Sequence, residues 1–130
     1  MKLPKKYIEL FFNVLDKTEP TLVDARIRDP FMKTLGEHFQ TYGQDREKIL
    51  IKFCKKTIPE GETEEKPLII DGKYQFDNTV LDELNKELIL LLAEEIELDC
   101  PKKIKDIANE TKYTPKFGEA EQIDLILNLI

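Results

Sequence analysis

The sequence contains no tryptophan, only one histidine and only two cysteines among 130 residues. A zinc site draws on several histidines and cysteines, and His38 has no second histidine to join it. On the long helix that the sequence predicts, Cys54 lies about four turns from His38, roughly 24 Å away, which excludes a cysteine–histidine pair within this one helix. A glycine-rich phosphate loop and a nucleophile elbow are also missing. We therefore expect a protein that is not an enzyme and that needs no cofactor or metal.

Long apolar runs and an excess of positive charge are absent as well. No apolar segment approaches the roughly 20 residues that span a bilayer, and no long apolar region follows Met1 as in a secretory signal. The net charge is −6, with 26 acidic and 20 basic residues, and the basic doublets are Lys55–Lys56 and Lys102–Lys103. Such a surface repels a phosphate backbone. We expect no membrane or nucleic-acid partner and no secretion, with Cys54 and Cys100 as free thiols rather than a disulfide.

What is present is a soluble globular composition, with 41% hydrophobic and 35% charged residues. A chain of this length can bury a hydrophobic core without disulfides or metals. We expect one domain over residues 1–130.

The clearest helical signal lies between residues 32 and 53. Apolar residues recur there at intervals of three and four, as on one face of a helix: Met32, Leu35, Phe39, Tyr42, Ile49 and Phe53. Asp29 is a good N-cap and Pro30 suits the first helical position, so we expect a helix over about 30–56. Residues 21–28 fit either an extended arm or an early turn of this helix. Gly36 and Gly43, inside it, indicate either close packing of another element or a tolerated weakness.

A second helix over about 78–94, capped by Asp77, carries the same spacing at Leu81, Leu84, Leu88 and Leu91. Between the two helices, residues 57–67 form an acidic mobile loop. Asp71–Gly72 then joins two short β-prone runs as a type I′ hairpin, whose apolar face should lie on the helices. The two helices therefore form an antiparallel hairpin.

Shorter elements complete the chain. We expect a short helix over 6–15, a half-buried strand over 95–100, a weak turn at 104–107, a loop over 112–118 and a terminal helix over 119–130. The fold class is thus mainly α (α+β): a long antiparallel helical hairpin, a short N-terminal helix, a small β-hairpin, one further strand and a C-terminal helix.

The end of the second helix is apolar on every side over residues 88–93. The long helix can cover one side only, which leaves Ile89, Leu90 and Leu92. Either the N-terminal helix and the C-terminal segment close over these residues, or they form a protein interface. Burial of a leucine or isoleucine side chain contributes about 2 kcal/mol, which an exposed side chain does not gain. We therefore expect a homo-oligomer, most simply a symmetric dimer.

Arg46 occupies a position of the apolar face of the long helix, between Tyr42 and Ile49. A buried guanidinium needs compensation, so the side chain either reaches the edge of the helix or pairs with a carboxylate of the second helix. The candidate partners are Glu83, Glu87 and Glu94. Arg46 is therefore a candidate for a buried ion pair that fixes the helix register, or for contact with an anion.

The order of these elements resembles a small uncharacterised family of proteins from tailed bacteriophages and prophages. The resemblance covers residues 22–130 and rests on Tyr42 and on the segments 45–50, 71–76, 84–88, 95–98 and 123–130. It implies a viral protein of the host cytoplasm or the virion, with no catalytic residues to carry over.

From this resemblance we expect a non-enzymatic phage protein that acts through protein–protein contacts, in a virion structural or assembly role. Its partners would be itself or another phage or host protein. The alternative is a counter-defence protein that sequesters a small anionic signal through Arg46 and lysines, or that blocks a host defence enzyme with its acidic faces.

Overall fold

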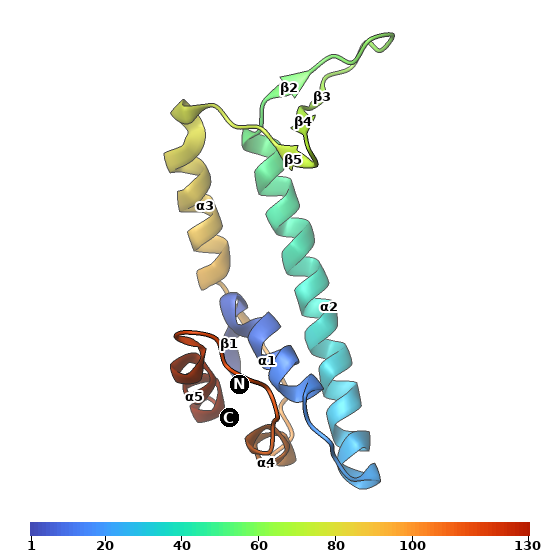
Figure 1. Cartoon of the computed structure of the whole chain (residues 1–130), viewed down its shortest axis with the longest axis vertical. Helices are drawn as coiled ribbons and strands as arrows, with labels where there is room; N and C mark the ends of the chain where they lie inside the picture. Colours follow the sequence, from blue (N-terminus) through green and yellow to red (C-terminus); the bar gives the residue numbers. More distant parts are fainter. The chain divides into compact units, whose positions relative to one another are not determined.

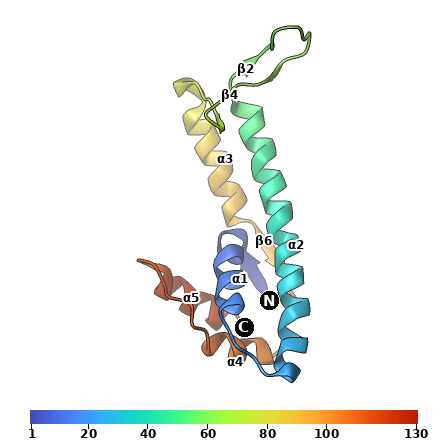
Figure 2. The same ribbon diagram turned by 45° about the vertical axis from the view of Figure 1, so that its right-hand side comes forward.

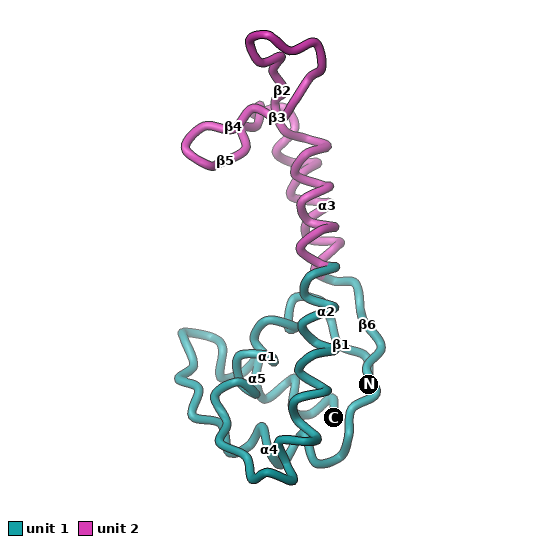
Figure 3. The backbone as a smooth tube through the Cα atoms, turned by 90° about the vertical axis from the view of Figure 1, so that its right-hand side faces the viewer, with its two compact units in different colours: residues 1–41, 93–130 teal, residues 42–92 magenta.

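A computed structural model describes residues 1–130, which form two compact units. Unit 1 comprises Met1–Thr41 and Ala93–Ile130, and unit 2 comprises Tyr42–Leu92 (Figure 3). The chain has five α-helices and three two-stranded antiparallel sheets. The predicted class, mainly helical α+β, is confirmed.

Helix α2 (Leu22–Phe53) has 32 residues, of which 22–41 belong to unit 1 and 42–53 to unit 2. The prediction that it begins at Pro30 is wrong, because residues 22–28 are helical and Pro30 lies inside the helix. The hydroxyl of Thr21 accepts a hydrogen bond from the backbone N–H of Asp24 at 3.2 Å, which caps the helix at this earlier point. Proline inside a helix costs about 3 kcal/mol. Burial of the next two core residues of α2, Phe31 and Leu35, opposes that cost.

The hydrophobic core of the chain lies in unit 1. Helix α1 (Ile8–Asp16) follows a 3₁₀ turn, η1 (Lys5–Tyr7), and lies between the first half of α2 and the C-terminal helices (Figure 2). These are α4 (Lys103–Asn109), where only a weak turn was predicted, and α5 (Glu119–Asn128), as predicted. The rings of Phe11 on α1 and Phe31 on α2 meet edge to face, with centroids 5.5 Å apart.

A strand pair joins the two sequence segments of unit 1. Strand β1 (Lys2–Pro4) runs antiparallel to β6 (Glu95–Glu97) and places Leu3 opposite Ile96. Both side chains are buried. The strand expected over residues 95–100 is thus present over its first three residues, whereas β1 was not predicted.

In unit 2, α3 (Leu81–Ala93, of which Ala93 falls in unit 1) lies beside the second half of α2 and runs in the opposite direction (Figure 1). The predicted helical hairpin is therefore confirmed. Before α3, the side chain of Asp77 accepts a hydrogen bond from the backbone N–H of Thr79 at 3.1 Å and caps the 3₁₀ turn η2 (Asn78–Val80). This hydrogen bond also lowers the pKa of Asp77, since it favours the carboxylate.

Two small strand pairs connect the helices of unit 2. Strands β4 (Ile69–Ile70) and β5 (Lys73–Tyr74) form the expected hairpin, with positive φ angles of 53° at Asp71 and 75° at Gly72, as a type I′ turn requires. Strands β2 (Lys56–Thr57) and β3 (Lys66–Pro67) pair the two ends of the segment that was expected to be a loop throughout.

The expectation that the apolar face of the hairpin lies on the helices is wrong for β4, because Ile69 and Ile70 are exposed. The hairpin is held instead by backbone hydrogen bonds from Lys55 to Gln75 and from Leu68 to Lys55, at 2.7 and 2.8 Å. A side-chain hydrogen bond from the hydroxyl of Tyr74 to the Glu47 carboxylate adds to these contacts.

The two glycines inside α2 do not mark close packing. A Cβ atom added at Gly36 or Gly43 would meet nothing within 4 Å. The interpretation as a tolerated weakness of the helix therefore holds, and at Gly36 the missing side chain leaves open space beside α1.

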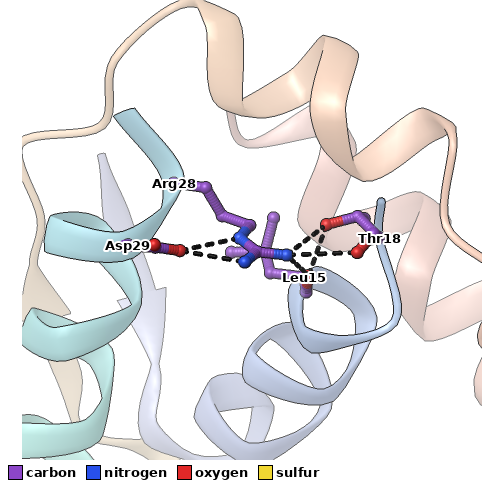
Figure 4. A network of polar contacts seen from close by, with 4 residues as sticks. All are labelled: Leu15, Thr18, Arg28 and Asp29. Carbon is purple, nitrogen blue, oxygen red and sulfur yellow. Dashed lines mark hydrogen bonds and ion pairs between the residues drawn. The ribbon is translucent and has the colours of Figure 1, made fainter. Parts of the chain in front are cut away.

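A network around Arg28 closes the C-terminal end of α1 (Figure 4). The Nη1 atom of Arg28 donates to the carbonyl oxygen and the hydroxyl of Thr18, both at 3.1 Å, and to the carbonyl oxygen of Leu15 at 3.5 Å. Thr18 is the buried polar residue of the core, and its hydroxyl donates to the Leu15 carbonyl at 2.6 Å. The other side of the guanidinium contacts Asp29 at 2.9 Å. Arg28 thus ties α2 to the residues that follow α1 and adds a donor to the Leu15 carbonyl in the last turn of that helix.

Candidate interaction surface

The apolar end of α3 is the most prominent exposed feature of unit 2. Ile89 is 65% exposed and Leu90 is 60% exposed, whereas Leu84 and Leu91 on the same helix are buried. With 3.6 residues per turn, Ile89 points about 160° away from Leu91 around the helix axis, and Leu90 about 100° away. We call Ile89 and Leu90 the α3 patch.

The three residues that were predicted as an interface differ in their exposure. Ile89 and Leu90 are exposed, and Leu92 is half-buried. The alternative, in which the N-terminal helix and the C-terminal segment close over this end of the helix, stays a prediction, because those elements belong to unit 1. Within unit 1, helix α1 packs against α4 and α5.

Unit 2 covers its own apolar surface poorly. Its buried apolar residues are Cys54, Leu84 and Leu91 alone, whereas the contiguous core of the chain belongs wholly to unit 1. A two-helix hairpin has no third layer to cover its outer faces. The exposure of the α3 patch follows from this architecture.

Arg46 does not form the predicted buried ion pair, because its side chain is exposed. Tyr42 and Ile49, the neighbouring residues on the predicted apolar face of α2, are half-buried as that prediction requires. Arg46 lies between them on the same face, but α3 does not cover it. The ion pair that connects α2 with α3 joins Lys52 to Glu87 at 2.7 Å. Both groups are partly exposed, so solvent screens this pair.

The structure brings together no cluster of metal-ligating side chains. His38 is half-buried, and no group of three or more histidine, cysteine or acidic side chains is placed to hold a metal ion. Cys54 and Cys100 are both free cysteines. Burial raises the pKa of the Cys100 thiol to about 11, so at neutral pH it is protonated and a poor nucleophile. None of the helices has the length and apolar character needed to cross a membrane.

Unit 1 contains a second exposed apolar feature, a cavity of about 230 Å³ between α1 and α2. It is lined by Glu9, Phe12 and Asn13 of α1 and by Gly36 and Phe39 of α2. The sequence analysis did not identify it, although Gly36 inside a helix was a usable signal. We call it the Gly36 cavity.

Comparisons of this chain with models of protein families, with curated proteins and with solved structures find no match.

Proposed function

We propose that this chain is a bacteriophage protein without catalytic activity that acts through protein–protein contacts, in the virion or during assembly in the host cytoplasm. The observation that carries the proposal is the α3 patch, two adjacent large aliphatic side chains that are exposed within the wholly apolar run 88–93 of a regular helix. The phage origin rests on the resemblance given above. The contact function rests on the patch.

Self-association is the simplest use of the α3 patch. A helix is a rigid platform, and two copies of α3 can pack side by side across a twofold axis, so that each patch meets the other. Exposed polar residues Asn85 and Lys86 lie one turn before the patch, which suits the polar rim of an interface. Burying Ile89 and Leu90 would contribute about 1.5–3 kcal/mol for each side chain.

The test replaces both residues of the patch by lysine, as Ile89→Lys with Leu90→Lys. Because both positions are exposed, the variant should keep the helical circular dichroism of the native chain, and sedimentation velocity should show a smaller assembly or a monomer. The matched control is Leu22→Lys with Val23→Lys, an equally adjacent apolar pair that is 71% and 66% exposed in the first turn of α2. The control should leave self-association unchanged. A native chain that is monomeric at all micromolar concentrations, with no phage or host protein bound, would contradict the proposal.

The counter-defence alternative has less support. Exposure of Arg46 leaves its guanidinium available to an anion, but Asp45 and Glu47 flank it in the sequence. Their negative charges oppose the binding of a small polyanionic signal. We therefore prefer the contact function.

A further inference from the structure

Phe117 is the most exposed apolar side chain of the chain, with a relative accessible area of 107%. It lies in unit 1, in the segment between α4 and α5. Aromatic side chains, phenylalanine among them, are enriched at protein interfaces. A fully exposed phenylalanine therefore indicates a site where another molecule binds.

The segment that carries Phe117 is held in place on both sides. At its start, the Thr111 hydroxyl donates to the Val14 carbonyl oxygen at 2.6 Å, and the backbone N–H of Lys112 donates to the carbonyl oxygen of Lys17 at 2.8 Å. These bonds fix the segment to the C-terminal end of α1.

Near Phe117 the Glu119 carboxylate accepts two hydrogen bonds. The donors are the Tyr113 hydroxyl at 2.8 Å and the backbone N–H of Lys116 at 2.7 Å. Gly118, with φ +80°, then turns the chain into α5. Phe117 is thus presented by an ordered segment, and an anchor that is already ordered loses little conformational entropy when it binds.

The Gly36 cavity offers a complementary receptor in the same unit. Two aromatic residues, Phe12 and Phe39, form its walls, and an added Cβ at Gly36 would meet no atom within 4 Å, so a flat ring can approach the helix backbone there. Its volume of about 230 Å³ is sufficient for one aromatic side chain. Aromatic rings pack favourably against one another in offset or edge-to-face arrangements.

Charge also matches across the two features. Glu9 lines the cavity and is exposed, and Lys116 is exposed next to Phe117 in the sequence. A ring that enters the cavity brings a lysine toward a carboxylate, and such complementarity fixes orientation and partner choice.

We propose that Phe117 of one copy of this chain binds in the Gly36 cavity of a second copy, with Lys116 facing Glu9. In a twofold dimer this contact occurs twice, since each copy supplies one ring and one cavity. It involves unit 1 alone and does not depend on the α3 patch. A chain with both contacts has two distinct surfaces for self-association and can build assemblies larger than a dimer.

The first test measures self-association of the full chain by sedimentation velocity across a concentration series. Phe117→Ala should raise the dissociation constant at least tenfold, and Gly36→Leu, which fills the cavity, should do the same. The matched control is Gly43→Leu, a second glycine of α2 with open space around it. It should leave the dissociation constant unchanged.

A charge exchange tests the orientation of the contact. Glu9→Lys alone and Lys116→Glu alone should each weaken the dimer, because each places like charges together. The double variant should restore much of the affinity, which a general effect on folding would not do.

A fluorescence reporter tests burial of residue 117 directly. Because the chain contains no tryptophan, the emission of a Phe117→Trp variant reports on this position alone. The emission should shift to shorter wavelength as the protein concentration rises, and Gly36→Leu in the same chain should abolish the shift.

These measurements are made both in the native chain and in the variant with Ile89→Lys and Leu90→Lys, so that failure of the α3 contact and failure of the Phe117 contact are distinguishable. An unchanged dissociation constant in both Phe117→Ala and Gly36→Leu would overturn the proposal. So would an emission spectrum that is independent of concentration up to the millimolar range.

Discussion

Replacement of Arg28 by methionine should lower the free energy of unfolding by about 2 to 3 kcal/mol. The guanidinium donates to two groups of Thr18 at 3.1 Å and lies at the C-terminal end of α1. Hydrogen bonds that involve a charged group contribute about 1.5–3 kcal/mol, and a cation at a helix C-terminus contributes about 0.3–1 kcal/mol. The Asp29 contact adds little to this, because that carboxylate is 62% exposed.

Methionine keeps most of the apolar stem of Arg28, so the loss reports on the guanidinium rather than on packing. Urea unfolding followed by circular dichroism gives the change in free energy. Hydrogen exchange at the backbone amides of Lys17 and Thr18, which follow α1 and donate to carbonyl oxygens of its last turns, gives a local measurement of the same effect. The matched control is Arg26→Met, an exposed arginine two residues earlier on α2, whose effect should stay within about 0.5 kcal/mol.

Arg28→Lys should fall between the two, because lysine keeps the charge but cannot donate from a planar fork to several acceptors. An Arg28→Met variant as stable as Arg26→Met, with unchanged exchange at Lys17 and Thr18, would refute the role of Arg28 in stabilising the C-terminal end of α1.

Two further predictions concern titratable groups. Burial raises the pKa of Cys100 from 9.0 to about 11, so its thiolate fraction at pH 8 should be about a hundredfold smaller than that of an unperturbed thiol. In a Cys54→Ser variant, alkylation of Cys100 should therefore be slow in the native protein and fast in urea. Equal alkylation rates in the two conditions would contradict this prediction. The pKa of Glu119 is lowered, first by the backbone N–H of Lys116 and then by the Tyr113 hydroxyl. Its contribution to stability is therefore present above its ordinary pKa of 4.5 and is lost as the pH falls through the lower folded-state pKa. Glu119→Gln should reduce the loss of stability on acidification, as measured by urea midpoints across that range, whereas an acid profile identical to that of the native chain would contradict the role of this carboxylate.

Elements with a strong local pattern could be predicted from the sequence. The spacing of Leu35, Phe39 and Tyr42 predicted a long helix, and Asp71–Gly72 predicted a type I′ hairpin that the φ angles confirm. The N-cap at Asp77 was likewise predicted. These features depend on residues close together in the chain, so the sequence alone contains the information that specifies them.

The candidate surfaces could be predicted only in part from the sequence. The apolar run over residues 88–93 predicted that some side chains would lack a covering partner, but not that Ile89 and Leu90 stay exposed while Leu92 is half-buried. The Gly36 cavity also escaped prediction, because its walls come from α1 and α2, two elements whose packing the sequence does not give.

By itself, the sequence determined the helical class and the turn at Asp71–Gly72. The tertiary structure alone decided three other features: α2 begins at Leu22 in spite of Pro30, Leu3 pairs with Ile96, and Arg28 rather than Arg46 forms a partly buried polar network. Each of these depends on groups that are distant in the chain or on burial of neighbouring side chains. Helix and turn propensities amount to about 1 kcal/mol per residue or less, and burial of side chains such as Phe31 and Leu35 outweighs them, so such features become determined only when the core is packed.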